Sequence, residues 1–301
     1  MKRRHFIQKL SAATALTGIS GLATACDNNK QLTILHTNDV HSHIDPFPLN
    51  DPRNPGMGGV ARRAVLIEKI RKQNPNTLLL DAGDIFQGTP YFNFYGGELE
   101  FKLMSKLKYD ASTIGNHDFD NGIDGLYAQL PHATFDFIIS NYDFSNTIMH
   151  GHTKPYKIFN KQGIKVGVFG LGIELQGLVN APLYKETKYL NPVEIATDMA
   201  NTLKEQEKCD LVICLSHLGY QYHNDKIDDL KLAKATKNID LIIGGHTHTF
   251  LPSPVTASNS IDKSVIINQV GCYGLYLGRI DYFFGDQKIT NSSTNRNLQV
   301  S

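Results

Sequence analysis

The segment from Gly115 to Asp120 concentrates side chains that can do chemistry. It reads Gly-Asn-His-Asp-Phe-Asp and follows an apolar run, residues 109–114, that is typical of a buried strand. Asn116 offers a neutral amide oxygen to a hard metal ion, and His117 can bind a metal or move a proton. Asp120 could hold the His117 ring in one tautomer through a hydrogen bond. Because ligands bind at the carboxyl ends of strands in open α/β sheets, this segment is a candidate site.

Four other predicted strands also end in polar side chains. Asp-x-His and His-x-His each place two side chains on the same side of an extended segment, because side chains alternate with period two. Gly-Asp supplies a carboxylate whose two oxygens can bridge two metal ions, and Ser-His supplies one more imidazole. These four motifs contain Asp39, His41, Asp84, His217, His246 and His248. The set is chemically suited to zinc, manganese and related ions, and it predicts a site for two of them.

Three neighbouring polar residues receive different interpretations. His36 lies inside the strand before Asp39 and is expected to pack there. His43 lies one step beyond the Asp39–His41 pair. We expect it to support the metal ligands rather than to bind a metal ion itself. Asp81 is nearer to its strand than Asp84 is, and we expect it to brace the turn.

Alternating strands and helices must position these motifs. Apolar runs predict strands at residues 32–36, 77–80, 109–114, 135–140, 164–171, 210–215, 239–243, 265–270 and 275–284. Helical periodicity predicts helices at residues 60–72, 98–108, 193–207 and 224–237. The alternation favours an α/β fold with a largely parallel core, closed by two antiparallel strands at its end. Residues 46–59 are rich in Pro, Gly and Asn and are expected to form a loop.

Composition excludes several classes of protein. The chain has 301 residues, with 41% apolar and 20% charged residues, which is enough for one large domain or two small ones. A formal net charge of +1 gives no basic excess for a nucleic-acid polymer and no acidic tail. Cys209, Cys214 and Cys272 form an odd set, so no disulfide framework is expected.

The first 25 residues have the features of an export signal. Arg3 and Arg4 resemble the twin-arginine signature, a weakly apolar stretch follows at residues 10–22, and residues 23–25 fit a cleavage site for small residues. An ordinary export leader with basic residues is the alternative. A transmembrane helix is not favoured, because the apolar run is short and interrupted by glycine.

Cys26 follows this segment directly and resembles the lipidated cysteine of a loose lipobox. Either Cys26 carries a lipid anchor, or signal peptidase cuts at the same bond. We therefore expect an exported protein, in the periplasm or anchored to the membrane facing it. Residues 26–31 would form a tether, residues 32–285 the catalytic domain, and residues 286–301 a polar tail that is frayed or part of a linker.

The strand-end motifs resemble those of the calcineurin-like metallophosphoesterases, and most of all the catalytic domain of bacterial 5′-nucleotidases. The resemblance runs from about Gln31 to Phe284. It rests on residues 38–41, 58–62, 83–90, 115–120 and 244–248. It implies the metallo-dependent phosphatase fold, an α/β/β/α sandwich in four layers, in which two mixed sheets are flanked by helices.

The same resemblance implies a role for each site residue. One divalent ion, zinc, manganese or similar, would be held by Asp39, His41, Asp84 and His248. The other would be held by Asp84, Asn116, His217 and His246. His117 would face the substrate, with Asp120 behind it.

The function expected from this site is release of phosphate from nucleotides or related phosphomonoesters. A phosphodiesterase for cyclic nucleotides or nucleotide sugars is one alternative, and a metal-binding subunit that is not catalytic alone is another. The 5′-nucleotidases carry a second domain that recognises the nucleotide, and the resemblance ends near Phe284. We therefore expect that a separate chain supplies this domain, or that the enzyme is less selective.

Overall fold

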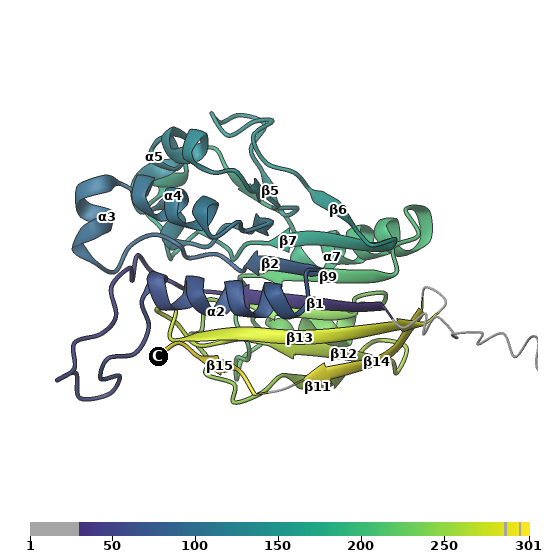
Figure 1. Cartoon of the computed structure of the whole chain (residues 1–301). Coiled ribbons are helices and arrows are strands. Elements are labelled where there is room, and N and C mark those ends of the chain that lie inside the picture. The colour runs from purple at the N-terminus through teal and green to yellow at the C-terminus, as the bar shows by residue number, and fades with distance from the viewer. Residues whose placement is uncertain (1–29, 286–287, 295) are drawn as a thin grey trace, which may run out of the picture.

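The computed structural model describes residues 30–285, 288–294 and 296–301 (Figure 1). The predicted signal peptide, Cys26 and the tether as far as residue 29 lie outside the described residues. Lys30 and Gln31, which we assigned to the tether, instead begin the first strand and pair with Phe284 and Phe283. None of the helices in the described part has the length and apolarity that crossing a bilayer requires.

The first sheet carries the amino-terminal motifs and has the strand order β14-β13-β1-β2-β3-β4. Its strands are β1 (Lys30–Thr37), β2 (Thr77–Asp81), β3 (Ala111–Ser112), β4 (Asp136–Phe137), β13 (Tyr276–Gly285) and β14 (Lys288–Thr294), with β15 (Leu298–Gln299) paired to β13. Strands β1 to β4 run parallel, so their carboxyl ends meet at one edge. Strand β13 is antiparallel to β1, as predicted.

The second sheet carries the other two motifs and has the order β11-β12-β10-β9-β7-β6. Its strands are β6 (Tyr156–Lys161), β7 (Ile164–Leu171), β9 (Leu211–Ser216), β10 (Leu241–Gly244), β11 (Val255–Ser258) and β12 (Ser264–Asn268). Strand β12 runs antiparallel to β11 but parallel to β10, so the antiparallel direction predicted for residues 265–270 holds on one side of this strand only. A short ribbon, β5 (Tyr142–Asp143) with β8 (Lys188–Tyr189), completes the strands of the described residues.

Helices cover the outer faces of the two sheets (Figure 1). They are α2 (Val60–Gln73), α3 (Pro90–Tyr95), α4 (Glu98–Lys106), α5 (Gly122–Gln129), α6 (Ala181–Tyr184), α7 (Pro192–Asn201) and α8 (Asp229–Ala235), with short turns η1 (His117–Phe119), η2 (Leu130–His132) and η3 (Thr202–Gln206). Helix α8 is shorter than predicted, because Asp228 caps its first turn by accepting a hydrogen bond from the Lys231 N–H.

Three apolar clusters hold the layers together. The central cluster joins the two sheets, with Ile34 and Leu78 from the first and Val166, Ile213 and Ile243 from the second. A second cluster packs the first sheet against α2, α4 and α5, and a third packs the other sheet against α7 and α8. The predicted four-layer sandwich is therefore confirmed.

Burial on both faces explains why the core strands read as continuous apolar runs. All five residues of β2 and all six of β9 are buried. By contrast, β14 is polar and lies at the edge of its sheet, and its composition did not reveal it as a strand. Residues 288–294 pair with β13, so the expectation of a frayed tail is wrong for this part of the chain.

Candidate metal centre

All five predicted strand-end motifs lie at neighbouring ends of the two sheets. Asp39 and His41 follow β1, Asp84 follows β2, and Asn116 lies beyond β3. His217 follows β9, while His246 and His248 follow β10. Because these strands are parallel within each sheet, residues more than two hundred positions apart meet at one edge of the sandwich.

The first group of converging side chains consists of Asp39, His41, Asp84 and His248. Their ligand atoms all lie within 4.8 Å of one another. Asp39 Oδ1 is 3.3 Å from His248 Nε2, and the two Nε2 atoms of His41 and His248 are 2.9 Å apart. Ligands about 2.1 Å from a tetrahedral ion are about 3.4 Å from one another, so these spacings suit one metal ion.

The second group consists of Asp84, His217 and His246, and it shares Asp84 with the first. Asp84 Oδ2 lies 3.8 Å from His41 Nε2 and 3.1 Å from His217 Nε2. The same carboxylate thus faces both groups, as a bridging ligand must. The side-chain oxygen of Asn116 lies 2.8 Å from His246 Nδ1, which places this amide with the second group.

The chemistry of these donors fits two divalent cations. Asp39 and Asp84 are 0% and 1% exposed, and no lysine or arginine of the described residues pairs with them. Buried carboxylates need a compensating charge. His217 Nε2 is buried with no hydrogen-bond partner among the described residues, and it points at Asp84. Metal ions would satisfy both requirements.

Backbone carbonyls orient the imidazoles that face the carboxylates. His217 Nδ1 lies 2.7 Å from the Ala82 oxygen, and His41 Nδ1 lies 3.1 Å from the Phe86 oxygen. A carbonyl accepts only, so each ring carries its proton on Nδ1 and leaves the Nε2 lone pair for a metal.

The carboxylates also set the protonation of the rings. Burial alone would lower the pKa of His217, but the charges of Asp84 and Asp39 outweigh it and raise that pKa to about 10. The pKa of His248 is likewise raised to about 10, since a hydrogen bond and the charge of Asp39 outweigh burial. By contrast, burial lowers the pKa of His246 to about 4. Without metal, protons on two rings compensate the carboxylates, and binding of a metal would release them.

Local backbone strain marks the same residues. Five of the seven predicted ligands have a left-handed backbone, with φ of 49° at Asp39, 49° at His41, 54° at Asp84, 72° at His246 and 51° at His248. Each such residue costs on the order of 1–3 kcal/mol, and such residues cluster at functional sites. The favourable free energy of packing the two sheets must offset this conformational cost.

Asp118 holds two of the strand-end loops together, and sequence analysis gave it no role. Its buried carboxylate accepts hydrogen bonds from the backbone N–H groups of Asp84, Ile85, Phe86 and Gly115, at 3.1, 2.9, 3.1 and 2.8 Å. The contact is close, because a Cβ on Gly115 would lie 2.1 Å from the Asp84 carboxylate. The available signal in the sequence was an acidic residue directly beside the predicted site residue His117.

His117 and Asp120 form the pair that was predicted from their spacing. His117 Nδ1 lies 2.8 Å from Asp120 Oδ2, and the His117 N–H donates to Asp84 Oδ1 at 2.8 Å. The hydrogen bond to Asp120 raises the pKa of His117 against the effect of burial. The side chain is 41% exposed, and its ring centroid is 5.2 Å from that of His41. This ring lies at the open edge of the metal groups without belonging to either.

His36 and Asp81 occupy the places predicted for them, whereas His43 packs against aromatic rings and makes no hydrogen bond to a ligand side chain among the described residues. His36 is buried in β1, where its Nε2 lies 2.8 Å from the side-chain nitrogen of Asn268. His43 belongs to neither group and lies against the rings of Phe47 and Tyr273. Asp81 braces the turn by accepting from the Gly83 N–H at 3.0 Å.

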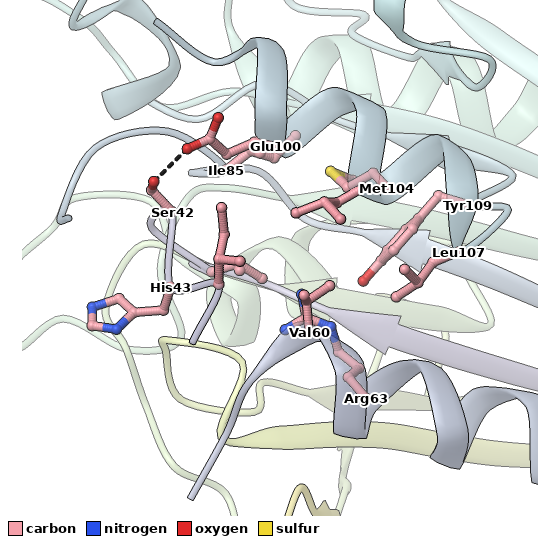
Figure 2. A pocket seen from close by; sticks show the side chains of 12 residues that line it. Ser42, His43, Val60, Arg63, Ile85, Glu100, Met104, Leu107 and Tyr109 are labelled. Carbon is pink, nitrogen blue, oxygen red and sulfur yellow. Dashed lines mark hydrogen bonds between the residues drawn. The ribbon is translucent and has the colours of Figure 1, made fainter. Parts of the chain in front are cut away.

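A small cavity lies behind the loop that carries His41 (Figure 2). Ser42 points toward this cavity and donates to Glu100 of α4, while Thr89 donates to the Ser42 carbonyl at 2.8 Å. Arg63 of α2 lines the opposite side, and its Nε and Nη1 have no hydrogen-bond partner in the described part of the chain. The cavity measures about 20 Å³, enough for one buried water but not for a substrate.

The three cysteines among the described residues are free and buried. Cys209 and Cys214 pack in the apolar cluster beneath α7 and α8, in accordance with the expectation of no disulfide framework.

The chain is similar in sequence to known phosphoesterases. The calcineurin-like phosphoesterase model matches residues 32–250. The snake venom 5′-nucleotidase of Crotalus adamanteus is 36% identical over 287 residues, which cover 88% of this chain and 47% of the relative. The trifunctional nucleotide phosphoesterase YfkN of Bacillus subtilis is 34% identical over 301 residues, covering 89% of this chain and 19% of that protein.

A solved structure agrees with these sequence matches. The 5′-nucleotidase precursor of Thermus thermophilus superposes with a TM-score of 0.81 at 32% identity, over 90% of this chain and 55% of that one. The chain thus spans about half the length of the 5′-nucleotidases to which it is similar.

The Asp118 network predicts a stability effect. Asp118→Asn replaces one acceptor oxygen by an N–H₂ group that faces backbone donors. We expect the free energy of unfolding to fall by about 2–4 kcal/mol, because buried backbone N–H groups lose their acceptor. Urea denaturation followed by circular dichroism measures this. Asp124→Asn, at a surface ion pair with Lys185, is the matched control and should cost less than about 1 kcal/mol. Equal stability of both variants would contradict the assignment.

The shared carboxylate predicts how metal content responds to mutation. After reconstitution with zinc or manganese, elemental analysis should find about two ions per chain. Asp84→Ala should lose both ions, because Asp84 belongs to both groups. His41→Ala should mainly weaken one of them, and the surface variant Asp124→Ala should keep two. Retention of two ions by Asp84→Ala would refute the bridging role.

Proposed function

The chain belongs to the calcineurin-like phosphoesterase family, and we propose that it releases phosphate from nucleotides or related phosphate monoesters. It is a metal-dependent phosphoesterase of the 5′-nucleotidase-like kind. The observation that carries the proposal is a pair of metal-ligand groups that share Asp84, with His117 at their open edge. Two ions spaced by one bridging carboxylate suit a phosphoryl group, which has oxygens on both sides of the reacting phosphorus.

We assign the ligands as the resemblance implies. Asp39, His41, Asp84 and His248 would hold one ion, and Asp84, Asn116, His217 and His246 would hold the other. Bound there, the two ions would supply an activated water and offset the charge of the phosphoryl oxygens. The surrounding residues keep the ligand atoms converged before metal binds, so little reorganisation accompanies the reaction.

His117 acts on the substrate side of this centre. Its ring is accessible, and Asp120 favours its protonated form. Protonated His117 stabilises charge on the phosphoryl oxygens or gives its Nε2 proton to the leaving alkoxide. Asp120 positions the ring through Nδ1 and does not itself reach the substrate.

Nucleotides are the substrate class that the relatives' names favour, since two matched proteins are 5′-nucleotidases. Diester cleavage is the second candidate, because the matched YfkN is a trifunctional nucleotide phosphoesterase. We further propose that a domain covering the metal centre, on this or a separate chain, strengthens selection of nucleotides. The proposal is supported by the exposure of His117 and by the greater length of the relatives.

We also propose that the protein is exported. The support is the twin-arginine-like segment with its cleavage site at residues 23–25, together with Cys26 as a candidate anchor. This placement would expose the metal centre to phosphate esters outside the cytoplasm.

A substrate panel tests the proposed function. The metal-loaded chain should release phosphate from an aryl phosphate and from AMP, and should hydrolyse a matched diester such as bis(p-nitrophenyl) phosphate at least about tenfold more slowly. A second negatively charged oxygen on the monoester lets both ions engage it, which favours the monoester. Faster hydrolysis of the diester would favour the second candidate, and no hydrolysis of any ester would refute the proposal.

The role of His117 predicts both a rate loss and a pH effect. His117→Asn should keep two metal ions and lose on the order of 10²–10⁴ in kcat, the usual range for a general acid. Asp120→Asn should lose less but should move the alkaline limb of the kcat profile to lower pH, because the Asp120 hydrogen bond raises the His117 pKa.

The exposed His150 provides the control for this test, since His150→Asn makes the same substitution at a histidine that belongs to neither metal group. Loss of metal from the His117 variant, measured by elemental analysis, would make His117 a ligand and overturn the assignment. An unchanged alkaline limb in Asp120→Asn would show that Asp120 does not raise the pKa of the catalytic acid.

A further inference from the structure

Three aromatic rings form a wall beside the first metal-ligand group. The His43 and Phe47 rings are stacked, with centroids 5.1 Å apart and planes at 12°. The Tyr273 ring lies 4.2 Å from His43 and 6.0 Å from Phe47. We call these three rings the aromatic wall. They come from segments more than two hundred residues apart.

The wall adjoins the metal ligands directly. The Tyr273 centroid is 6.0 Å from the rings of both His41 and His248, which belong to the first group. None of the three rings of the wall is part of a ligand group, so their faces are not used in metal binding. All three are partly exposed, and they therefore present aromatic surface at the side of the centre.

The backbone holds the wall in place. Tyr273 has a left-handed φ of 62°, and its N–H donates to the Asp39 carbonyl at 2.7 Å. Phe47 is fixed by its N–H bond to the Met57 carbonyl at 2.8 Å, within the loop 46–59. His43 borders the cavity behind its loop, and in Figure 2 its ring extends away from Met104 and Tyr109 on the far side of that cavity.

These contacts suggest a purpose beyond packing. A left-handed backbone is costly for a bulky aromatic residue, and here it presents the ring of Tyr273 to solvent beside two metal ligands. A ring needed only for the core would be covered. The wall contains neither lysine nor arginine, the side chains that would compete most strongly with metal ions for a phosphoryl group. Its surface suits a flat apolar group attached to that phosphoryl.

We propose that the aromatic wall is a subsite for the leaving group of the ester, and that it selects planar groups, an aryl ring or a nucleobase. This inference rests on the proposed phosphatase function. Aromatic pairs gain about 0.5–1.5 kcal/mol beyond burial when rings stack offset or meet edge to face. Because the wall flanks one side of the centre only, it favours flat groups without distinguishing strongly among bases.

The test compares substrates that share a phosphoryl group and differ in the group attached to it. KM and kcat are measured for phenyl phosphate, AMP and glycerol 3-phosphate with the metal-loaded wild type and with Tyr273→Leu and Phe47→Leu. In both variants KM should rise about 3- to 10-fold more for the two aromatic esters than for the glycerol ester, in line with the loss of one aromatic contact. Tyr273→Phe keeps the ring and should restore most of the preference.

A variant at the surface shows whether the effect is specific to the aromatic wall or follows from the loss of any aromatic ring. Phe94 of α3 is 83% exposed, so Phe94→Leu makes the same change outside the wall and should leave the ratio of KM values unaltered. Metal content and melting temperature, measured for each variant, show that the centre and the fold persist.

A binding measurement is independent of catalysis. Saturation transfer from protein to adenosine, observed by NMR, should be present in the wild type and reduced in Tyr273→Leu. Equal changes of KM for all three esters, or unchanged transfer to adenosine in the variant, would overturn the proposed subsite. If the wild type hydrolyses no ester and yet binds adenosine through Tyr273, the phosphatase proposal fails and the aromatic site stands.

Discussion

Two carboxylates buried together are the constraint on which the rest of this structure depends. Asp39 and Asp84 lie at the ends of adjacent strands, out of water, among imidazoles and without a lysine or arginine partner in the described residues. Such a cluster is unfavourable unless positive charge is bound between the groups. Protons on His217 and His248 can supply it in part, and two divalent ions can supply it fully. The electrostatics of these buried groups therefore favour the binding of cations between them.

Holding these groups close together has a conformational cost that the sheets must bear. Five of the ligand positions have a left-handed backbone, and glycines at 83 and 115 let two loops approach within contact of each other. Asp118 then fixes the approach by accepting four backbone N–H bonds. Cores on both faces of each sheet make the strand ends rigid, so the strained loops have a fixed base.

The His117–Asp120 pair and the aromatic wall adjoin the centre and differ in chemistry. His117 and Asp120 offer a proton and a positive charge at the open edge, which suits the phosphoryl oxygens and the leaving oxygen. The aromatic wall offers flat, neutral surface on the side of His41 and His248. An ester placed between them would have its charged part at the metals and its planar part against the rings. These two groups would therefore orient a bound ester at the metal centre without enclosing it in a pocket.

Sequence alone determined the ligand types, because each motif is local: a strand, a turn and two or three polar residues are contiguous in the chain. The motifs allowed a proposal for Asp39, His41, Asp84, Asn116, His217, His246, His248 and the His117–Asp120 pair. The alternation of strands and helices indicated an α/β fold, and the four layers were implied by the family resemblance. Only the tertiary structure decided which side chains meet. Several features depend on contacts between distant segments. They are the orientation of Asp84 toward both groups, the four hydrogen bonds to Asp118, the pairing of β12 parallel to β10, the edge strand β14 and the contact of His43 with Tyr273. No periodic pattern in these local sequences predicts such contacts. The contacts depend on how the two twisted sheets pack and on where the connecting loops can then fit.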